Sequence, residues 1–148
     1  MDVEDLTTIP WYPPMQRRHD IDDETLVDHV RDVTTIAVDV VETLTDRRGT
    51  DISMDTVLAG ALVHDVSKLY EYDGFADTEV ERLLGHPHYG VHVTAAAGLP
   101  VDIQHVVLAH SDLTAVDPAT LPALVVKRAD DVAAAAITTT AVADLRDV

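Results

Sequence analysis

Apolar residues recur every three or four positions along most of the chain, the spacing that places them on one face of a helix. The first such stretch starts after Ile21, where Asp22 or Asp23 can cap a helix, and Gly49 ends it. Its apolar positions are Leu26, Val30, Val33, Ala37, Val40, Val41 and Leu44. The pattern predicts one long amphipathic helix with a single buried face.

A second stretch is apolar on nearly all sides, which predicts a buried central helix. It begins near Ser53 or Asp55, both good N-caps, and runs through the sequence VLAGALVHD. Residues 69–77 are predicted to form a loop. Four more helices are predicted after it: TEVERLL, a helix from His86-Pro87 to about Ala97, VDIQHVVLAH, and LVVKRADDVAAAAITTTAV, whose threonine run predicts fraying.

Strands are not predicted, because the sequence has no period-two alternation flanked by hairpin turns and no internal repeat. The length suits one domain with a real core. We therefore expect an all-α fold, a compact bundle of about six helices in residues 21–148, preceded by an arm in residues 1–20. Pro10, Pro13 and Pro14 predict that this arm is irregular, and it should lie across the domain or a neighbouring subunit.

The sequence is strongly acidic, which limits the partners that its surface can bind. Asp and Glu total 27 and Lys and Arg total 10, so the formal net charge is -17. Such a surface repels nucleic acid and anionic membranes. The excess of Asp over Glu and the presence of only two lysines, Lys68 and Lys127, predict a halophilic cytoplasmic protein in which salt screens the repulsion between carboxylates.

Export and thiol chemistry are not expected. The N-terminal sequence MDVEDLTT lacks the apolar core of a signal peptide, and no apolar run reaches the ~18 residues of a membrane helix. The chain has no cysteine, which excludes disulfides, thiolate metal sites and a cysteine nucleophile.

Six histidine and aspartate side chains fall at the ends or on the apolar faces of different predicted helices. They are His29, His64, Asp65, His86, His110 and Asp130. Helices that cross around a common core can each contribute one ligand to a metal site. Imidazole and carboxylate together suit a borderline divalent ion such as Fe, Mn, Co, Ni or Zn.

The order of these residues resembles that of the HD-domain metal-dependent phosphohydrolases. The matching segments are DHVRDVTTIA, ALVHDVSKL, GHPHYGVHVTAAAGLP, HVVLAHS and VVKRADDVAAA, which follow one another in this order through roughly residues 26–136. A bare His-Asp dipeptide carries little weight, but the ordered set, with Lys68 after the dipeptide, is specific. The Gly-Tyr-Pro signature of the cyclic-dinucleotide subgroup is absent.

The resemblance implies a set of four core metal ligands: His29, His64, Asp65 and Asp130. Family members that hold a second ion add two intervening histidines. In this chain those histidines correspond to His86 and His110, with Asp65 as the bridging carboxylate. The site would then hold two divalent ions about 3.5 to 4 Å apart.

Two of these positions have alternatives. His88 and His92 lie four residues apart on one helix face, and His88 could replace His86 as a ligand. His86 is preferred because the His-x-x-Tyr-Gly pattern that it starts is closest to that of the family. Asp131 could likewise replace Asp130, which is preferred because it directly follows a small residue.

The other polar candidates have weaker support. Lys68 is expected either to contact the substrate phosphate or to pair with a carboxylate. His19 and His105 are predicted to be surface or helix-face residues. Three arginines could assist an anionic substrate: Arg17, Arg18 and Arg128.

The implied reaction is hydrolysis of a small phosphoester or nucleotide by a phosphomonoesterase or phosphodiesterase. Asp65 would orient or deprotonate the attacking water, and Lys68 would offset the developing negative charge. Two alternatives are a di-iron oxygenase, since some HD-domain proteins with these six ligands act on a C-H or C-P bond, and a non-catalytic regulatory module. The proline-rich arm with its single tryptophan, Trp11, suggests a homodimer.

Overall fold

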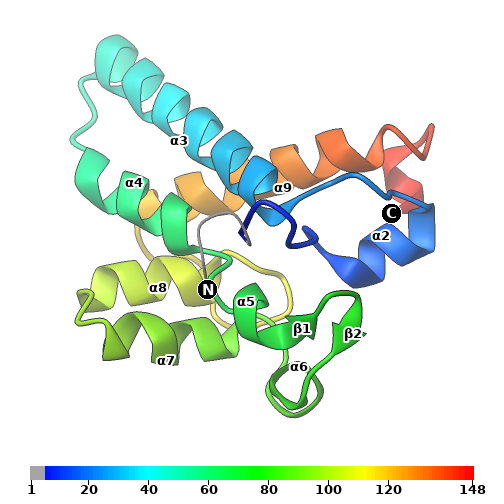
Figure 1. The fold of residues 1–148 in the computed structure, drawn as a ribbon. Helices are drawn as coiled ribbons and strands as arrows, with labels where there is room; N and C mark the ends of the chain where they lie inside the picture. The colour runs from blue at the N-terminus through cyan, green and yellow to red at the C-terminus, as the bar shows by residue number, and fades with distance from the viewer. Residues whose placement is uncertain (1–5) are drawn as a thin grey trace.

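Four helices surround one apolar core in this computed structural model, which describes residues 6–148 (Figure 1). These helices are α3 (Leu26–Arg48), α4 (Met54–Val63), α8 (Val101–Ala109) and α9 (Leu121–Thr138), and α7 (His88–Ala96) packs against α8. The remaining elements are α2 (Pro13–His19), α5 (Lys68–Glu71), β1 (Tyr72–Asp73), β2 (Ala76–Asp77), α6 (Glu79–Leu83) and the 3-10 helix η1 (Leu145–Asp147). The predicted all-α fold is confirmed.

The long helix α3 begins later than either predicted cap. Thr25 is its N-cap, and its hydroxyl oxygen accepts a hydrogen bond from the Asp28 N–H at 3.2 Å. The stretch before it stays extended because the Leu26 N–H donates to the Ile9 carbonyl at 2.9 Å and the Trp11 N–H donates to that of Glu24 at 3.2 Å. The C-terminal end matches the prediction, since Gly49 caps α3 with a φ of 62°.

The N-terminal arm is not irregular throughout, because Pro13 and Pro14 begin the helix α2. Proline is tolerated in a first turn, where the missing N–H would have no intrahelical partner. Gln16 ties this helix to the domain by donating from Nε2 to the carbonyl oxygens of Ile21 and Glu24, both at 3.1 Å. The arm therefore folds onto its own domain. Residues 1–5 of the predicted arm lie outside the described residues.

The helix α4 begins after Ser53, as predicted, but it is not buried on all sides. Leu58 and Leu62 are 39% and 55% exposed, whereas its opposite face packs against α3, α8 and α9. Gly60 lies on that packed face, where an added Cβ would come within 2.7 Å of Val106 Cγ1 on α8. A glycine is therefore needed for α4 and α8 to approach this closely.

The segment after α4 contains more structure than the predicted loop. It forms the single helical turn α5 and then a small hairpin in which β1 and β2 pair antiparallel, Tyr72 opposite Asp77. Gly74 occupies the turn with a φ of 59°. The Arg17 guanidinium donates to the Phe75 carbonyl and so joins α2 to this hairpin. Such short strands carry no alternating pattern, which is why the sequence did not predict them.

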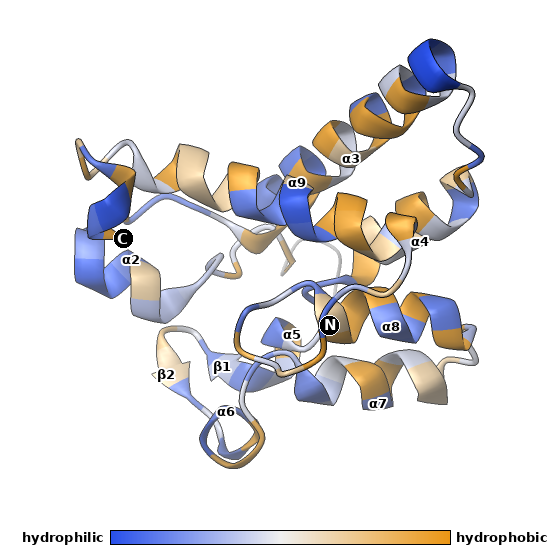
Figure 2. Ribbon diagram, turned by 180° about the vertical axis from the view of Figure 1, so that it is seen from behind, coloured by the Kyte–Doolittle hydropathy of each residue, from blue (hydrophilic) through white to orange (hydrophobic). Residues whose placement is uncertain are grey.

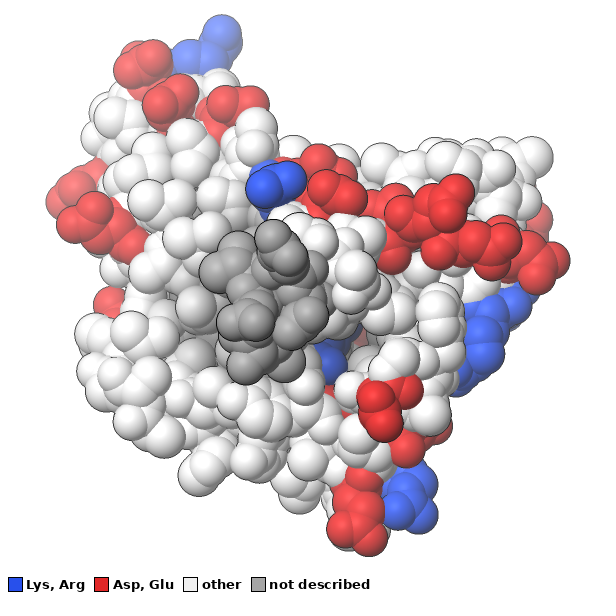
Figure 3. All heavy atoms as spheres, viewed as in Figure 1, with Lys and Arg blue, Asp and Glu red and all other residues white. Residues whose placement is uncertain are grey.

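The surface agrees with the composition. Apolar and polar positions alternate along α3 and α9, as amphipathic helices require (Figure 2). Acidic side chains outnumber basic ones on the face in Figure 3. Within residues 6–148, no helix combines the length and the hydropathy that crossing a membrane requires.

Candidate metal centre

The His-Asp pair lies where α4 ends and the chain turns toward α5. Both residues are buried: His64 has no exposed surface, and Asp65 is 2% exposed. His64 Nδ1–H donates to the carbonyl oxygen of Ala61 at 2.7 Å, which turns the ring so that Nε2 points away from α4. That nitrogen lies 3.4 Å from Asp65 Oδ2 and 3.6 Å from Asp130 Oδ1.

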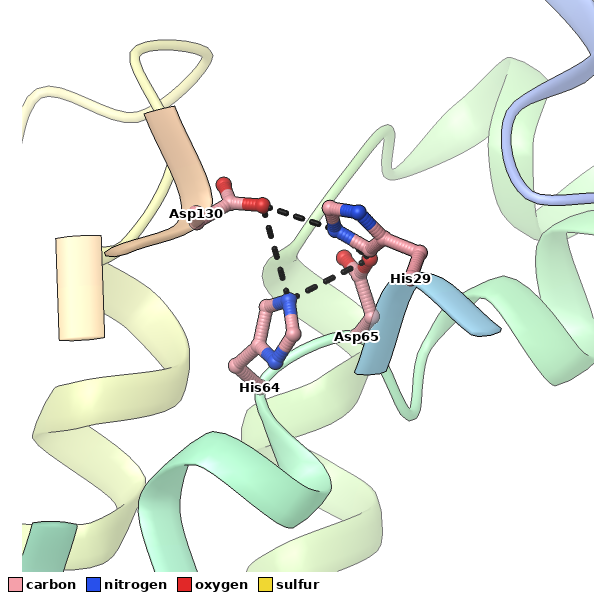
Figure 4. A group of neighbouring side chains, drawn as sticks. All are labelled: His29, His64, Asp65 and Asp130. Carbon is pink, nitrogen blue, oxygen red and sulfur yellow. Dashed lines mark hydrogen bonds and ion pairs between the residues drawn. The ribbon is translucent and has the colours of Figure 1, made fainter. Parts of the chain in front are cut away.

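The helices α3 and α9 bring two more of the predicted residues to this point (Figure 4). His29, from the first turn of α3, places Nε2 2.8 Å from Asp130 Oδ1 and 3.5 Å from Asp65 Oδ2. One ligand atom from each of the four residues lies within 4.8 Å of the others. Three helix contacts, α3 with α4, α3 with α9 and α4 with α9, therefore assemble this first group.

A second group forms on the other side of Asp65. His86 Nε2 and His110 Nε2 each lie 3.3 Å from Asp65 Oδ1 and 3.0 Å from one another. Asp65 thus directs Oδ2 toward the His29 and His64 pair and Oδ1 toward the His86 and His110 pair. The two groups share this one carboxylate.

Three of the four histidines make outward hydrogen bonds that indicate what the two groups can hold, whereas His29 Nδ1 is buried without a hydrogen-bond partner among the described residues. Nδ1–H of His110 donates to the Val107 carbonyl at 2.7 Å, as that of His64 does to Ala61. His86 Nδ1 faces both carboxylate oxygens of Glu71, at 3.0 and 3.1 Å. When each of these three rings is neutral with its proton on Nδ1, its Nε2 presents a lone pair inward.

Lone pairs and carboxylate oxygens repel each other unless a cation lies between them. His64 Nε2 is buried and has no hydrogen-bond partner among the described residues. A divalent ion satisfies such donors, since imidazole and carboxylate are common ligands of transition metals. The residues of each group therefore fit a metal ion.

The pKa values follow from the same crowding of charge. Burial lowers the pKa of His64, but Asp65 and Asp130 outweigh it and raise that pKa from 6.5 to about 10. Burial raises the pKa of Asp65, but Lys68 and His64 bring it well below its usual value. Without a metal ion, a proton on His64 therefore supplies the missing positive charge.

In the second group, the pKa values of the two histidines shift in opposite directions. Burial lowers the pKa of His86, but Asp65 and Glu71 outweigh this effect and raise it. Burial lowers the pKa of His110, and the hydrogen bond to Asp65 offsets only part of that effect. His110 is thus neutral near pH 7, the form that binds a metal ion.

Lys68 pairs with a carboxylate, which is one of the two roles predicted for it. Its Nζ lies 2.8 Å from Asp65 Oδ2, and the residue is only 6% exposed. The ammonium also lies 4.8 Å from the centre of the Tyr12 ring and 5.8 Å from that of Trp11, within the range of cation-π attraction. Lys68 nevertheless lines the cavity above the two groups, so it remains available to a ligand there.

That cavity has a volume of about 710 Å³, and metal-binding candidates form part of its lining. Residues from both groups line it, including Asp65, His86, His110 and Asp130. A cavity of this size suits a small organic molecule.

The structure separates the predicted alternatives. His86 joins the cluster, whereas His88 and His92 are exposed and belong to neither group. Asp130 likewise joins the cluster, whereas Asp131 pairs with Arg128 at 2.9 Å.

The remaining histidines and arginines lie outside the two groups. His19 is half-buried, and His105 Nε2 accepts a hydrogen bond from the Ala119 N–H at 2.9 Å. Arg17 is engaged by the hairpin, and Arg18 lines the cavity.

Sequence reasoning missed three buried residues that support the site. Glu71 is fully buried beside His86, and Ser67 Oγ lies 3.1 Å from His86 Nδ1. The centre of the Trp11 ring lies 5.4 Å from that of the His29 ring. Glu71 lies in the segment predicted as a loop, where a carboxylate gives no sign of burial. Only its position three residues after Lys68 could have indicated that Glu71 lies near the site.

Comparison with known proteins agrees with this arrangement. The chain is similar to the dihydroneopterin 2′,3′-cyclic phosphate phosphodiesterase of Methanocaldococcus jannaschii, with 30% identity over 111 residues. That match covers 72% of this chain but 45% of the relative, so the chain spans less than half of the relative's length. No solved structure matches the chain. A model of the HD domain matches residues 26–135, which include all six candidate ligands, and the chain therefore belongs to the HD domain family.

Proposed function

We propose that this protein is a metal-dependent phosphodiesterase that hydrolyses a small phosphate ester at a dinuclear centre. The observation that carries the proposal is the position of Asp65, whose two oxygens face two different pairs of histidines at 3.3 to 3.5 Å. A carboxylate shared in this way suits a pair of ions of the kind that two-metal hydrolases use. The relative named above is itself a phosphodiesterase, which favours a diester over a monoester as substrate.

The proposed ligands of the first ion are His29, His64, Asp65 and Asp130. Those of the second ion are Asp65, His86 and His110. Bound divalent ions would supply Lewis acidity and lower the pKa of a water molecule to near neutrality. Fe, Mn, Ni, Co and Zn all accept this set of nitrogen and oxygen donors.

The protein's own residues would then place and polarise the substrate. Asp65 would orient the attacking water or accept its proton. Lys68 would direct its ammonium toward the phosphate, where it offsets the negative charge that develops as the new P–O bond forms. Its contacts with Asp65 and the two aromatic rings hold that ammonium in place before substrate arrives.

The overall charge makes these local cations necessary. A protein of net charge -17 repels a phosphate ester at long range. The metal ions, together with Lys68 and the Arg18 side chain at the cavity, would reverse the potential at short range.

Hydrolysis of 2′,3′-cyclic AMP, followed by ³¹P NMR on protein loaded with each candidate metal, tests the proposal. We expect metal-dependent turnover, and Lys68→Met should reduce kcat by about a hundredfold with the metal content intact. Asp65→Asn should abolish both turnover and tight metal binding, whereas His88→Gln should change neither. Full metal content in Asp65→Asn would contradict the proposed centre.

Parallel assays with bis(p-nitrophenyl) phosphate and p-nitrophenyl phosphate separate diesterase from monoesterase activity. Oxygen consumption by the iron-loaded protein tests the oxygenase alternative. The phosphodiesterase relative supports hydrolysis over that alternative and over a regulatory module.

The setting of the protein is part of the same proposal. The low lysine content and high net charge support a halophilic cytoplasmic protein with a small anionic substrate and no nucleic acid polymer as partner. Unfolding followed from 0.1 to 3 M KCl tests the first point, since a halophilic protein gains stability over this range. Sedimentation velocity tests the proposed homodimer, for which Trp11 gives less support than expected because it is buried within its own chain.

A further inference from the structure

The chain has two lysines, Lys68 and Lys127, and both are buried, with 6% and 7% of their surface exposed. Burial of a lysine is rare, because the ammonium loses its hydration and the long side chain loses rotamer freedom. The burial of Lys68 is explained by its ion pair with Asp65 in the candidate centre. The burial of Lys127, in α9, needs an explanation of its own.

Asp112 does not by itself account for the burial of Lys127. Lys127 Nζ lies 2.5 Å from Asp112 Oδ1, but the Asp112 side chain is 86% exposed. An ion pair with such a partner forms equally well at the surface, and an exposed pair contributes only about 0 to 1 kcal/mol. Another group must therefore draw the ammonium into the interior.

The other partner of this ammonium is the carbonyl oxygen of His110, 3.5 Å from Lys127 Nζ. Helix α8 ends at Ala109 and His110 is its C-cap, so this carbonyl belongs to the negative end of the helix. At 3.5 Å the contact is mainly the attraction of a cation for that end, rather than a short hydrogen bond. Lys127 therefore caps α8 from α9, and Asp112 in the following loop holds the ammonium in place.

This cap connects two helices that carry ligands of different metal-binding groups. His110 belongs to the second group, and its Nδ1–H donates to the Val107 carbonyl on α8, so its ring moves with the last turn of that helix. Asp130 belongs to the first group and follows Lys127 by three residues on α9, about one helical turn (Figure 4). Lys127 therefore links the backbone of one ligand to the helix that carries the other.

We infer that Lys127 is a positioning residue for the dinuclear centre: it holds His110 in place relative to Asp130 and so fixes the second ion relative to the first. The inference rests on the proposed function, because it requires two ions. Lys127 acts through the end of α8 and not through a contact with the substrate. The same contact holds Asp112, which lines the cavity.

Charge and position predict opposite effects of removing this ammonium. By charge alone, loss of a cation near the second ion tightens the binding of that ion. Loss of the cap weakens it, because His110 Nε2 is no longer held at 3.3 Å from Asp65 Oδ1. Lys127→Met nearly preserves the length of the side chain and should weaken binding of the second ion about tenfold, the lower end of the effect of residues behind a metal ligand.

Calorimetric titration with Mn²⁺ measures both binding steps, and the first should keep its affinity in Lys127→Met. Unchanged or tighter binding of the second ion in this variant would overturn the inference. Lys127→Arg should restore the wild-type affinity, because a guanidinium also donates to a carbonyl and a carboxylate. Failure of arginine to improve on methionine would count equally against the role of the cation.

Arg128→Met is the matched control, since it removes the same charge from the neighbouring position of α9. Arg128 pairs with Asp131 at 2.9 Å rather than with α8. This variant should leave the affinity for the second ion unchanged. Equal weakening in Arg128→Met and Lys127→Met would assign the effect to net charge and overturn the inference.

Electron paramagnetic resonance of protein saturated with Mn²⁺ tests the position of the second ion directly. The spin coupling between two ions depends on their separation, whereas a substitution that only destabilises the fold leaves it unchanged in the folded protein. Lys127→Met should alter the coupling. Asp112→Asn loosens the same ammonium from an exposed position, without disturbing the core, and should alter it in the same direction. A wild-type spectrum in both variants would overturn the inference.

The two proposals fail in different ways. A wild type that binds two ions but hydrolyses no phosphodiester would contradict the proposed function, while the titrations and spectra would still decide the role of Lys127. A phosphodiesterase whose Lys127→Met variant binds both ions as the wild type does would overturn the positioning role alone. Fewer than two ions in the saturated wild type would overturn both.

Discussion

Glu71 and His86 form a buried carboxylate-imidazole pair behind the candidate metal centre. Both carboxylate oxygens of Glu71 lie within 3.1 Å of His86 Nδ1, and Glu71 has no exposed surface. The pair keeps the proton on Nδ1 and turns Nε2 toward Asp65 Oδ1, 3.3 Å away. A carboxylate behind a metal-binding histidine fixes the ring and increases its basicity.

Glu71→Gln should therefore weaken binding at the second metal position by about 10- to 100-fold while leaving the first unchanged. Calorimetric titration with Mn²⁺, together with elemental analysis, measures both sites. Glu79→Gln removes a carboxylate that is 81% exposed and serves as the control. Two equally tight sites in Glu71→Gln would show that the pair has no such role.

The number of metal ions bound per chain distinguishes His86 from His88 as the ligand. His86→Ala should bind one equivalent of metal rather than two, because its Nε2 is one of only two imidazole nitrogens in the second group. His88→Ala should retain both equivalents, since His88 is exposed and its Nδ1 lies only near the Gly85 carbonyl, at 3.3 Å. The reverse result would transfer the ligand role to His88.

Metal removal should make the stability depend on pH in a defined direction. The pKa of His64 rises from 6.5 in the unfolded chain to about 10 in the metal-free folded protein, because Asp65 and Asp130 outweigh burial. A raised pKa stabilises the fold fully below pH 6.5, and this contribution is lost as the pH rises toward 10. His86, whose pKa is also raised, adds a contribution of the same sign.

Urea unfolding of chelator-treated protein between pH 6.5 and 10, at fixed high salt, should show this decline. His64→Gln should flatten it, since the titrating group is gone. Metal affinity should increase over the same range, because the ion must displace the His64 proton. A metal-free wild type whose stability is constant across this window would contradict the assignment.

The close approach of α4 and α8 at Gly60 gives a prediction about stability. Gly60→Ala places a Cβ within 2.7 Å of Val106 Cγ1, so the helices must separate. Overpacking of this kind costs about 1 to 3 kcal/mol, which thermal or urea unfolding detects. Val106→Ala removes the clashing methyl groups, so adding Gly60→Ala to that background should cost much less. An equal cost in both backgrounds would exclude the clash as the cause.

Helical periodicity predicted α3, α4 and α9, together with the caps at Gly49 and Ser53. It failed where contacts distant in sequence decide the backbone. Thr25 rather than Asp22 or Asp23 starts α3, because pairing with residues 9–11 keeps the preceding stretch extended. The arm became helical at Pro13 because proline at a first turn costs little and Gln16 secures the helix from the other side.

The sequence by itself determined which residue types are available for the site and their order, and this order identified all six residues that the fold brings together. The pattern around His86 favoured that residue over His88, but nothing in the sequence showed that Glu71 would be buried beside it, because Glu71 lies in a segment that was predicted to be a loop. Tertiary structure buries His86 against Glu71 and leaves His88 exposed. It also placed Asp65 between two pairs of histidines, since only the crossing of α3, α4, α8 and α9 brings side chains so distant in sequence within a few ångströms.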